Sequence, residues 1–241
     1  MRYKERRYRS WIWRDGLFSF RVQVKETDLL VLAEKDLRER AKEEVIQIRQ
    51  QLEEYIRENP SFGEALRPLP PDPLAPPLIG EMYEASRACG VGPMAAVAGA
   101  VAEAVGRSLA SDSEEVIVEN GGDIYLRVKG PCRVGIFAGK SPLSMKVGLM
   151  IPPERTPLGV CTSSGSVGPS LSMGRADAVC VVARSAALAD AAATFLGNMV
   201  RDEKDVKRAL QRARGIQGIE GTVIIVGETL GVWGDYPLVR I

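Results

Sequence analysis

Residues 159–183 read GVCTSSGSVGPSLSMGRADAVCVVA, and this stretch constrains the fold more than any other. Its second half, RADAVCVVA, has the continuous apolar content of a strand that is buried in a core. Its first half is a run of hydroxyl-bearing residues and glycines with almost no apolar mass. A chain with this pattern needs a sheet in its core, and the polar loop beside that sheet is the first candidate for a binding element.

The N-terminal part predicts strands followed by a helix. Residues 8–33 read as a β-meander, with a turn at 14–16 and alternating apolar and polar residues over 18–25. Apolar residues then recur at steps of three and four over 36–59, which predicts a long amphipathic helix that covers a sheet or contributes to a dimer. Seven prolines in 60–77 predict an extended connector of polyproline II character.

The C-terminal part predicts an antiparallel sheet covered by helices. Gly92 and Pro93 precede a helix whose first turns consist of small residues, which would let another backbone or a flat ligand come close. Short strands follow over 114–183 at the spacing of an antiparallel sheet. Two further helices and a closing set of strands are predicted over 187–200, 202–215 and 221–241. The sequence therefore predicts an α+β protein.

Composition narrows the function classes. The chain contains no histidine, which excludes Ser-His-Asp and Cys-His relays. Its 32 basic and 31 acidic residues nearly cancel, so no overall charge favours nucleic acid or an anionic membrane. No apolar run is long enough to span a bilayer, and the basic N-terminus lacks a signal peptide's apolar segment, so a cytoplasmic location is expected. Four cysteines form no C-x-x-C pair and are expected to be small buried hydrophobic residues.

Two loops are candidates for ligand contact. Asn120, Gly121, Gly122 and Asp123 lie between two strands, where paired glycines serve a hairpin turn or the close approach of a ligand. The segment 161–168, CTSSGSVG, offers hydroxyls and backbone amides that suit a phosphate or a nucleotide edge, although a flexible surface loop has the same composition.

Asp190 and Thr194 are the candidates for metal binding and catalysis. They lie four residues apart in a predicted helix and so share one face. One carboxylate and one hydroxyl are adequate for Mg²⁺, which keeps waters and completes its shell with substrate phosphate. An aspartate near the start of a helix also serves as a capping residue, and both alternatives remain open at this point.

Together these motifs resemble a known family. ENGGDIY, TSSG and ADAAAT occur in the order found in the ApbE-type FAD:protein FMN transferase superfamily, and GPMAAVAGA at 92–100 looks like the counterpart of its helix motif. The resemblance is closer still to an uncharacterised cytoplasmic ApbE-like subfamily, and it is strong over residues 60–200. It implies one ApbE-like α+β domain over 1–241, built from tandem T-fold-like halves: 1–77 plus the C-terminal strands, and 78–241.

The resemblance also implies roles for particular residues. Mg²⁺ would bind Asp190, Thr194 and the carbonyl of Ala96. FAD or FMN, or another nucleotide, would lie against Gly92 at the start of the helix. It would also lie against eight residues of the two loops: Asn120, Gly121, Gly122, Asp123, Thr162, Ser163, Ser164 and Gly165. The metal would polarise the pyrophosphate while FMN passes to an acceptor protein. The chain departs from the transferases in lacking their H-x-x-D-P-x-T-G segment, and Val97 and Pro169 stand where a Lys and a His are usual.

Three functions are therefore expected as alternatives. The first is Mg²⁺-dependent transfer of FMN from FAD to a protein. The second is a flavin- or nucleotide-binding accessory protein without turnover. The third, which the subfamily suggests, is a factor in the assimilation of sulphide to homocysteine, in which Cys161 would be the cysteine to test. Possible partners are a small nucleotide or flavin, an acceptor protein and a second copy of the chain; neither nucleic acid nor a membrane is expected.

Overall fold

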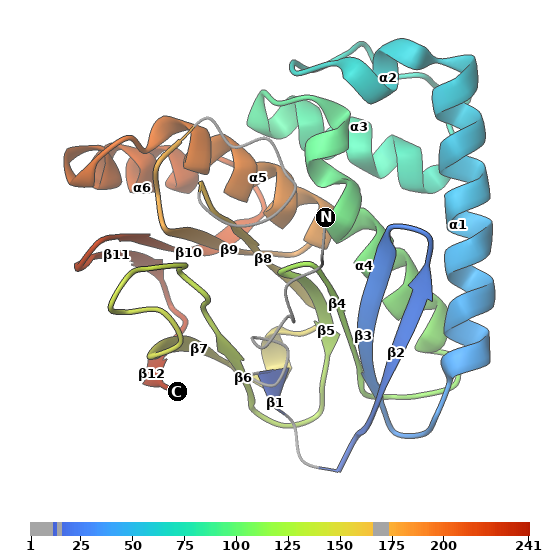
Figure 1. Ribbon diagram of the computed structural model, residues 1–241, viewed down its shortest axis with the longest axis horizontal. Helices are drawn as coiled ribbons and strands as arrows, with labels where there is room; N and C mark the ends of the chain where they lie inside the picture. Colours follow the sequence, from blue (N-terminus) through green and yellow to red (C-terminus); the bar gives the residue numbers. More distant parts are fainter. Residues whose placement is uncertain (1–11, 14–15, 166–173) are drawn as a thin grey trace.

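The computed structural model describes residues 12–13, 16–165 and 174–241. Its centre is an eight-stranded antiparallel sheet with the strand order β11-β10-β9-β8-β5-β4-β3-β2 (Figure 1). The strands are β2 (Phe18–Val24), β3 (Thr27–Ala33), β4 (Val116–Asn120), β5 (Asp123–Arg127), β8 (Leu158–Ser163), β9 (Ala178–Ala183), β10 (Ile219–Val226) and β11 (Thr229–Gly234). The predicted α+β class with antiparallel pairing is confirmed.

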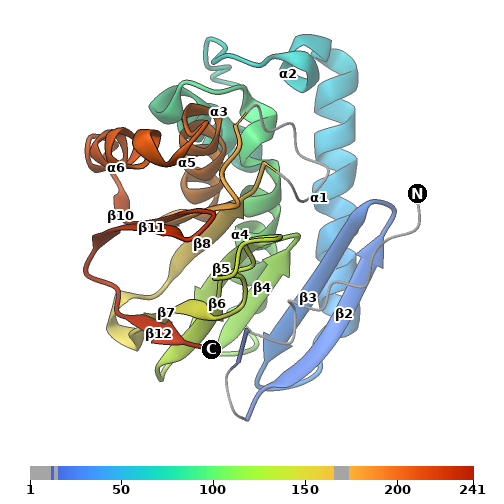
Figure 2. The ribbon, with the colours of Figure 1, turned by 60° about the vertical axis from the view of Figure 1, so that its left-hand side comes forward.

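Helices cover one face of this sheet and a second sheet covers the other (Figures 1 and 2). The helices are α1 (Arg38–Glu58), α2 (Pro60–Glu64), α3 (Pro77–Cys89), α4 (Val97–Leu109), α5 (Ala186–Met199) and α6 (Val206–Arg214), with short 3₁₀ turns η2 (Pro93–Ala96), η3 (Pro153–Arg155) and η4 (Glu203–Asp205). The second sheet has the order β1-β6-β7-β12. Its strands are β1 (Ile12–Trp13), β6 (Cys132–Gly135), β7 (Val147–Ile151) and β12 (Leu238–Arg240).

Each interface between layers has its own apolar core. Leu29, Val31 and Val181 face the helices, whereas Leu32, Ile117 and Val182 face the small sheet. This alternation follows from the period of two in a strand. The nearly continuous apolar sequence of β9 is explained because all six of its residues are buried between the two covering layers.

The large sheet repeats one arrangement twice. A hairpin, a helical segment and a second hairpin form β2–β3, α1–α4 and β4–β5; the same order recurs in β8–β9, α5–α6 and β10–β11. The two halves meet where β5 pairs with β8. This repeat divides the sheet between β5 and β8.

Two expectations about the N-terminal part were wrong. The first strand of the predicted meander over 8–33 does not pair with β2: β1 pairs with β6 in the small sheet. Residues 14–15 of the predicted turn lie outside the described part of the chain. The segment 60–77 is not extended throughout, because Pro60 opens the helix α2. The ring of Phe62 fixes this helix, 5.1 Å from each of the rings of Tyr55 and Tyr83.

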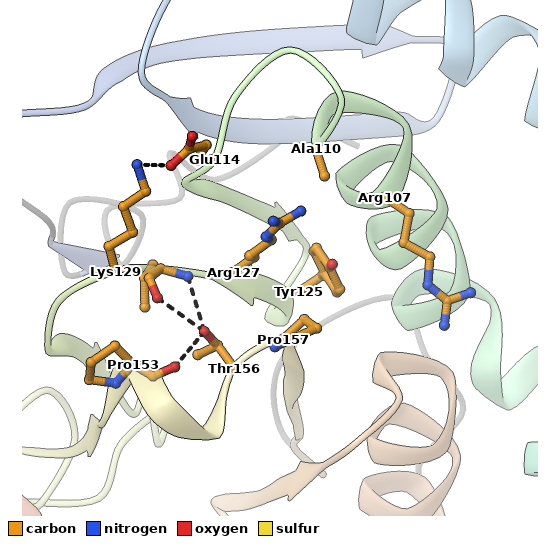
Figure 3. Close-up of a pocket in the computed structure, with 10 residues that line it drawn as sticks. Arg107, Ala110, Glu114, Tyr125, Arg127, Lys129, Pro153, Thr156 and Pro157 are labelled. Carbon is orange, nitrogen blue, oxygen red and sulfur yellow. Dashed lines mark hydrogen bonds and ion pairs between the residues drawn. The ribbon is translucent and has the colours of Figure 1, made fainter.

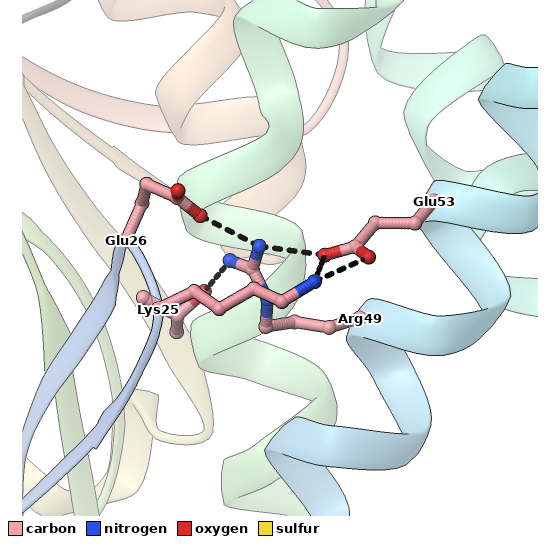
Figure 4. A network of polar contacts seen from close by, with 5 residues as sticks. Lys25, Glu26, Arg49 and Glu53 are labelled. Atoms are coloured by element: carbon pink, nitrogen blue, oxygen red, sulfur yellow. Dashed lines mark hydrogen bonds and ion pairs between the residues drawn. The ribbon is translucent and has the colours of Figure 1, made fainter.

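The β2–β3 hairpin is tied to α1 by charged side chains (Figure 4). Arg49 donates to Glu26 and to Glu53, each over 2.7 Å, and to the Thr27 hydroxyl over 2.8 Å. Lys25 donates to Glu53 over 2.8 Å. Most of these groups are exposed, so the network orients α1 on the hairpin more than it stabilises the fold.

Candidate functional site

The site is built where α4 and α5 cross. Gly99 makes the crossing possible: a Cβ atom there would lie 2.1 Å from the carbonyl oxygen of Ala186. The small residues predicted for these helices therefore serve the packing of one backbone on another. Ala95 in η2 and Ala98 in the first turn of α4 remain partly exposed, so this end of the helix is also accessible.

Each of the two helices caps the N-terminus of the other. Asp190 Oδ2 accepts a hydrogen bond from the backbone N–H of Gly99 over 2.9 Å. In return, Glu103 Oε2 accepts one from the N–H of Ala186 over 2.7 Å and one from the Ser185 hydroxyl over 3.1 Å. The arrangement is reciprocal. Glu103 stands four residues after Gly99, which donates to Asp190, and Asp190 stands four residues after Ala186, which donates to Glu103. Asp190 therefore does not cap its own helix, whose N-cap is Ser185; it caps α4 instead.

The Asn120–Asp123 segment forms the hairpin turn between β4 and β5. Gly121 and Gly122 have φ values of 72° and 109°, which explains the need for glycine. The turn is held in place by Glu119, which accepts from the Gly122 N–H over 2.8 Å. Asn120 Nδ2 donates to the carbonyl of Ala98 over 3.1 Å and so joins the turn to the start of α4.

The third predicted segment is part strand and part loop. Thr162 and Ser163 belong to β8, so the expectation of a loop from Cys161 was wrong for these residues. The Thr162 N–H donates to the Gly122 carbonyl over 3.1 Å, which brings β8 beside the hairpin turn. Ser164 is partly exposed and Gly165 is exposed. Residues 166–168 of the predicted loop, and Pro169, lie outside the described residues.

Successive β8 side chains face opposite layers. Cys161 faces the helices, and its thiol donates to the Ala186 carbonyl over 3.3 Å. The Thr162 hydroxyl hydrogen-bonds the thiol of Cys180, on the side of the small sheet. Burial nevertheless raises the pKa of Cys180 to about 11. Thr162 therefore reaches the site through its backbone, whereas its hydroxyl is used in the core.

Asp123 and Asp190 form a pair of acids at the centre of the site. Burial raises the pKa of Asp190 to about 7, against the lowering effect of the Gly99 and Ala98 N–H groups. Burial and the charge of Asp190 raise the pKa of Asp123 well above its usual range. Within the described part of the chain, neither carboxylate forms an ion pair with a Lys or Arg. Two neighbouring carboxylates with raised pKa values, and with no Lys or Arg partner among the described residues, favour binding of a proton or a metal ion.

The other capping carboxylate has its counter-charge within the chain. Glu103 forms an ion pair with Arg107, four residues further along α4. The position equivalent to Arg107 on α5 is Thr194, four residues after Asp190. Glu103 is thus paired with the Arg107 guanidinium, whereas the equivalent position beside Asp190 carries the hydroxyl of Thr194.

The oxygen donors that the sequence predicts for the metal are of the kind that Mg²⁺ prefers. A carboxylate, the Thr194 hydroxyl and the Ala96 carbonyl are hard oxygen donors, and Mg²⁺ needs few protein ligands because it retains water. Asp190 and Thr194 are both partly exposed, and η2, which contains Ala96, packs against α5. Among the described residues, no three His, Cys, Asp or Glu side chains come together as a metal cluster. Mg²⁺ bound by Asp190 and Thr194 would complete its shell with water and a ligand.

All four cysteines are buried and none is in a disulfide, as expected. Burial, and the charges of Asp123 and Asp190, raise the pKa of Cys161 well above its usual range. A buried, protonated thiol is a poor nucleophile. Cys161 therefore packs as a small hydrophobic residue beside the acids.

Gly92, which precedes η2, has a packing role. A Cβ atom there would lie 1.7 Å from the Ala65 carbonyl oxygen. The glycine therefore lets the segment 65–76, here called the strap, cross the start of η2. Sequence reasoning missed Glu103 and Arg107 as parts of the site. The available signal was a charged residue at 103 within the otherwise small and apolar first turns of α4.

A pocket of about 500 Å³ lies at the other end of the β5–β8 pair (Figure 3). The last turns of α4, the end of β5 and the segment 153–157 line it, and Tyr125 and Arg127 project into it from the same face of β5. None of the predicted site residues lines this pocket. It is distinct from the acid pair at the start of β5.

In the described part of the chain, no helix taken singly has the length and apolar content to cross a membrane. The helices over 77–89 and 93–109 reach that length and composition only together, and they are bent by 104°.

Solved structures of ApbE proteins share this fold. An ApbE protein of Thermotoga maritima aligns with a TM-score of 0.56 at 13% identity, covering 89% of this chain and 96% of that one. The apo form of the flavinyl transferase ApbE of Pseudomonas stutzeri aligns with a TM-score of 0.55 at 17% identity, covering 92% and 95%. At such identities the likeness establishes the ApbE fold.

Sequence comparison gives the family. A UPF0280 protein of Methanosphaerula palustris is 45% identical over 217 residues, which span 89% of this chain and 90% of that protein. A UPF0280 protein of Methanocaldococcus jannaschii is 39% identical over 226 residues, which span 91% and 92%. The family model described as AbpE bacteria matches residues 9–228. With this match along most of its length, the chain belongs to the AbpE bacteria family, within the ApbE-like superfamily.

Proposed function

We propose that this protein binds a flavin or another nucleotide together with Mg²⁺ at Asp190 and Thr194, and that it transfers FMN from FAD to a hydroxyl of an acceptor protein. The observation that carries the proposal is the pair formed by the buried Asp123 and the partly exposed Asp190, which has no basic partner among the described residues. The names of the structural neighbours support the flavin part, since one of them is a flavinyl transferase.

The residues around the acid pair suit a phosphorylated ligand. The start of α4 carries a partial positive charge, and the neighbouring Ala95 and Ala98 are partly exposed. Ser163 and Ser164 add hydroxyls at the end of β8. Mg²⁺, when bound, would draw electron density from a pyrophosphate and neutralise the charge that develops on it.

The transfer balances without a histidine. The acceptor oxygen forms a bond to the FMN phosphorus, the bond from that phosphorus to the pyrophosphate bridging oxygen breaks, and AMP leaves. The acceptor's hydroxyl proton passes to water. The chain's own part is to hold the phosphates in line with the acceptor, a contribution of orientation.

Calorimetric titration with Mg²⁺ and FAD, together with chromatography for AMP, tests the proposal. FAD should bind more tightly with Mg²⁺, and Asp190→Asn should remove the Mg²⁺-dependent part. Asp235→Asn, at an exposed aspartate in the C-terminal part, is the matched control and should bind as the wild type does. Absence of Mg²⁺ and nucleotide binding by the wild type would refute the proposal.

The accessory-protein alternative is separated by the same experiment. It predicts FAD binding without release of AMP at any concentration of acceptor. Mass spectrometry of the ligand that the purified protein carries would identify the nucleotide. A thiol-based role in sulphide assimilation is not supported by the burial and raised pKa of Cys161.

A further inference from the structure

Glu103 and Arg107 lie outside every predicted motif, yet they are linked to Asp190 through one pair of helices. Glu103 is 1% exposed, and its two oxygens are fully used. One accepts from Arg107, and the other from the Ala186 N–H and the Ser185 hydroxyl. These are the first residues of α5 and its N-cap, so Glu103 fixes where that helix begins.

The position of Asp190 depends on this anchor. Asp190 stands one turn after Ala186, about 6 Å along the helix axis. The Ala186 carbonyl lies so close to Gly99 that a Cβ atom on residue 99 would not fit. The start of α5 is therefore fixed by Glu103 on one side of the crossing and by the Asp190–Gly99 bond on the other.

Arg107 pairs with Glu103 and extends the anchor to a third helix. A buried carboxylate without a counter-charge would be protonated or displaced. Arg107 supplies that charge and also donates to Glu81 of α3 over 2.6 Å. Figure 3 shows its side chain extending away from the ion pair of Lys129 with Glu114 on the far side of the pocket. The pair thus connects α3, α4 and α5.

We propose that Glu103 and Arg107 are positioning residues that hold Asp190 in the orientation in which it binds the cation. The inference rests on the proposed function, because the cation at Asp190 belongs to that proposal. Both residues act through the start of α5 and touch neither the cation nor the nucleotide. Residues that orient a metal ligand typically change metal affinity by about 10- to 100-fold when they are removed.

The experiment measures two quantities for each variant: the Mg²⁺ affinity by calorimetry, and the midpoint of unfolding in urea. It does not depend on an activity assay. Glu103→Ala should weaken Mg²⁺ binding about 10-fold or more. Glu103→Gln should stay within a few-fold of the wild type, because the amide oxygen still accepts from the Ala186 N–H. Arg107→Gln should weaken binding in the wild-type background and have little effect in the Glu103→Gln background, where no charge needs neutralising.

Asp28 and Arg21 provide a matched control. Asp28 is 2% exposed, as the Glu103 side chain is, and its Arg21 partner is 57% exposed, against 52% for Arg107. This pair joins β2 to β3, away from α5. Asp28→Ala should lower stability without changing Mg²⁺ affinity.

The outcomes separate the two proposals. If the wild type binds no Mg²⁺, the proposed function fails. If the wild type binds and the Glu103 and Arg107 variants bind equally well, the positioning role fails. Equal loss of affinity in the Asp28 variant would show a general effect of stability, and would also overturn the inference. If Glu103→Ala does not fold, the Arg107→Gln comparison in the two backgrounds decides alone.

Discussion

Replacing Asp190 by Asn should remove a pH dependence from the stability of the metal-free protein. The folded protein raises the pKa of this carboxyl from 3.8 to about 7 by burying it. Between these values the folded state keeps a proton that the unfolded state has released. The free energy of unfolding should therefore fall as the pH rises from about 4 to about 7, and the full penalty is present above that range.

The size of this pH effect follows from the difference between the pKa of Asp190 in the unfolded and folded states. One pKa unit corresponds to about 1.4 kcal/mol, so the rise from 3.8 to about 7 sets a ceiling of about 4 kcal/mol. In Asp190→Asn the side-chain amide oxygen would still accept from the Gly99 N–H, but the side chain carries no charge. The stability of Asp190→Asn relative to the wild type should accordingly increase by up to about 4 kcal/mol between about pH 4.5 and pH 8.

Urea unfolding followed by tryptophan fluorescence, in EDTA, measures this difference. Asp235→Asn should follow the wild type at every pH, since that aspartate is exposed. Saturating Mg²⁺ at pH 8 should stabilise the wild type, by about 2.7 kcal/mol at 100 times the dissociation constant, and should not stabilise Asp190→Asn. Parallel pH curves for the wild type and Asp190→Asn in EDTA would refute the reasoning.

Three further predictions concern the same crossing. Thr194→Arg should reproduce the Glu103–Arg107 arrangement, raising metal-free stability at pH 8 by about 1.5–3 kcal/mol and abolishing the stabilisation by Mg²⁺; thermal unfolding with and without Mg²⁺ measures both. Gly99→Ala should destabilise the protein by about 1–3 kcal/mol in urea, because its Cβ atom would meet the Ala186 carbonyl; a wild-type midpoint would contradict the close packing. Iodoacetamide should leave Cys161 unmodified in the folded protein and modify it in urea, as mass spectrometry of the peptide would show; rapid native labelling would contradict its burial.

Local pattern was sufficient for most of the elements. The apolar period over 36–59 predicts a helix that the structure places at Arg38–Glu58. The strands from β4 to β9 follow from apolar runs between turn residues. Pro60 was misread because a proline-rich composition outweighed the preference of proline for the first turn of a helix.

Long-range partners could not be predicted from such patterns. β1 is two residues long and pairs with a strand more than a hundred residues away. The Gly99–Asp190 bond spans 91 positions of the sequence, and the Ala186–Glu103 bond spans 83. The four motifs were expected to share a site, and the structure does bring the start of α4, the glycine turn, the end of β8 and Asp190 together. That Asp190 would also cap α4 depends on the angle at which two helices cross, which only the fold determines.

The small sheet has a consequence for engineering. β1 and β12 are its two edge strands, three strand spacings or about 14 Å apart. The register brings the beginning of β1 and the end of β12 to the same end of that sheet. In a chain that begins at β1, a short glycine-serine bridge from the end of β12 to the beginning of β1 would therefore close the backbone into a ring. Opening the ring in the strap near Leu74, which is 92% exposed, would give a circular permutant whose cleavage point lies far in sequence from both capping helices.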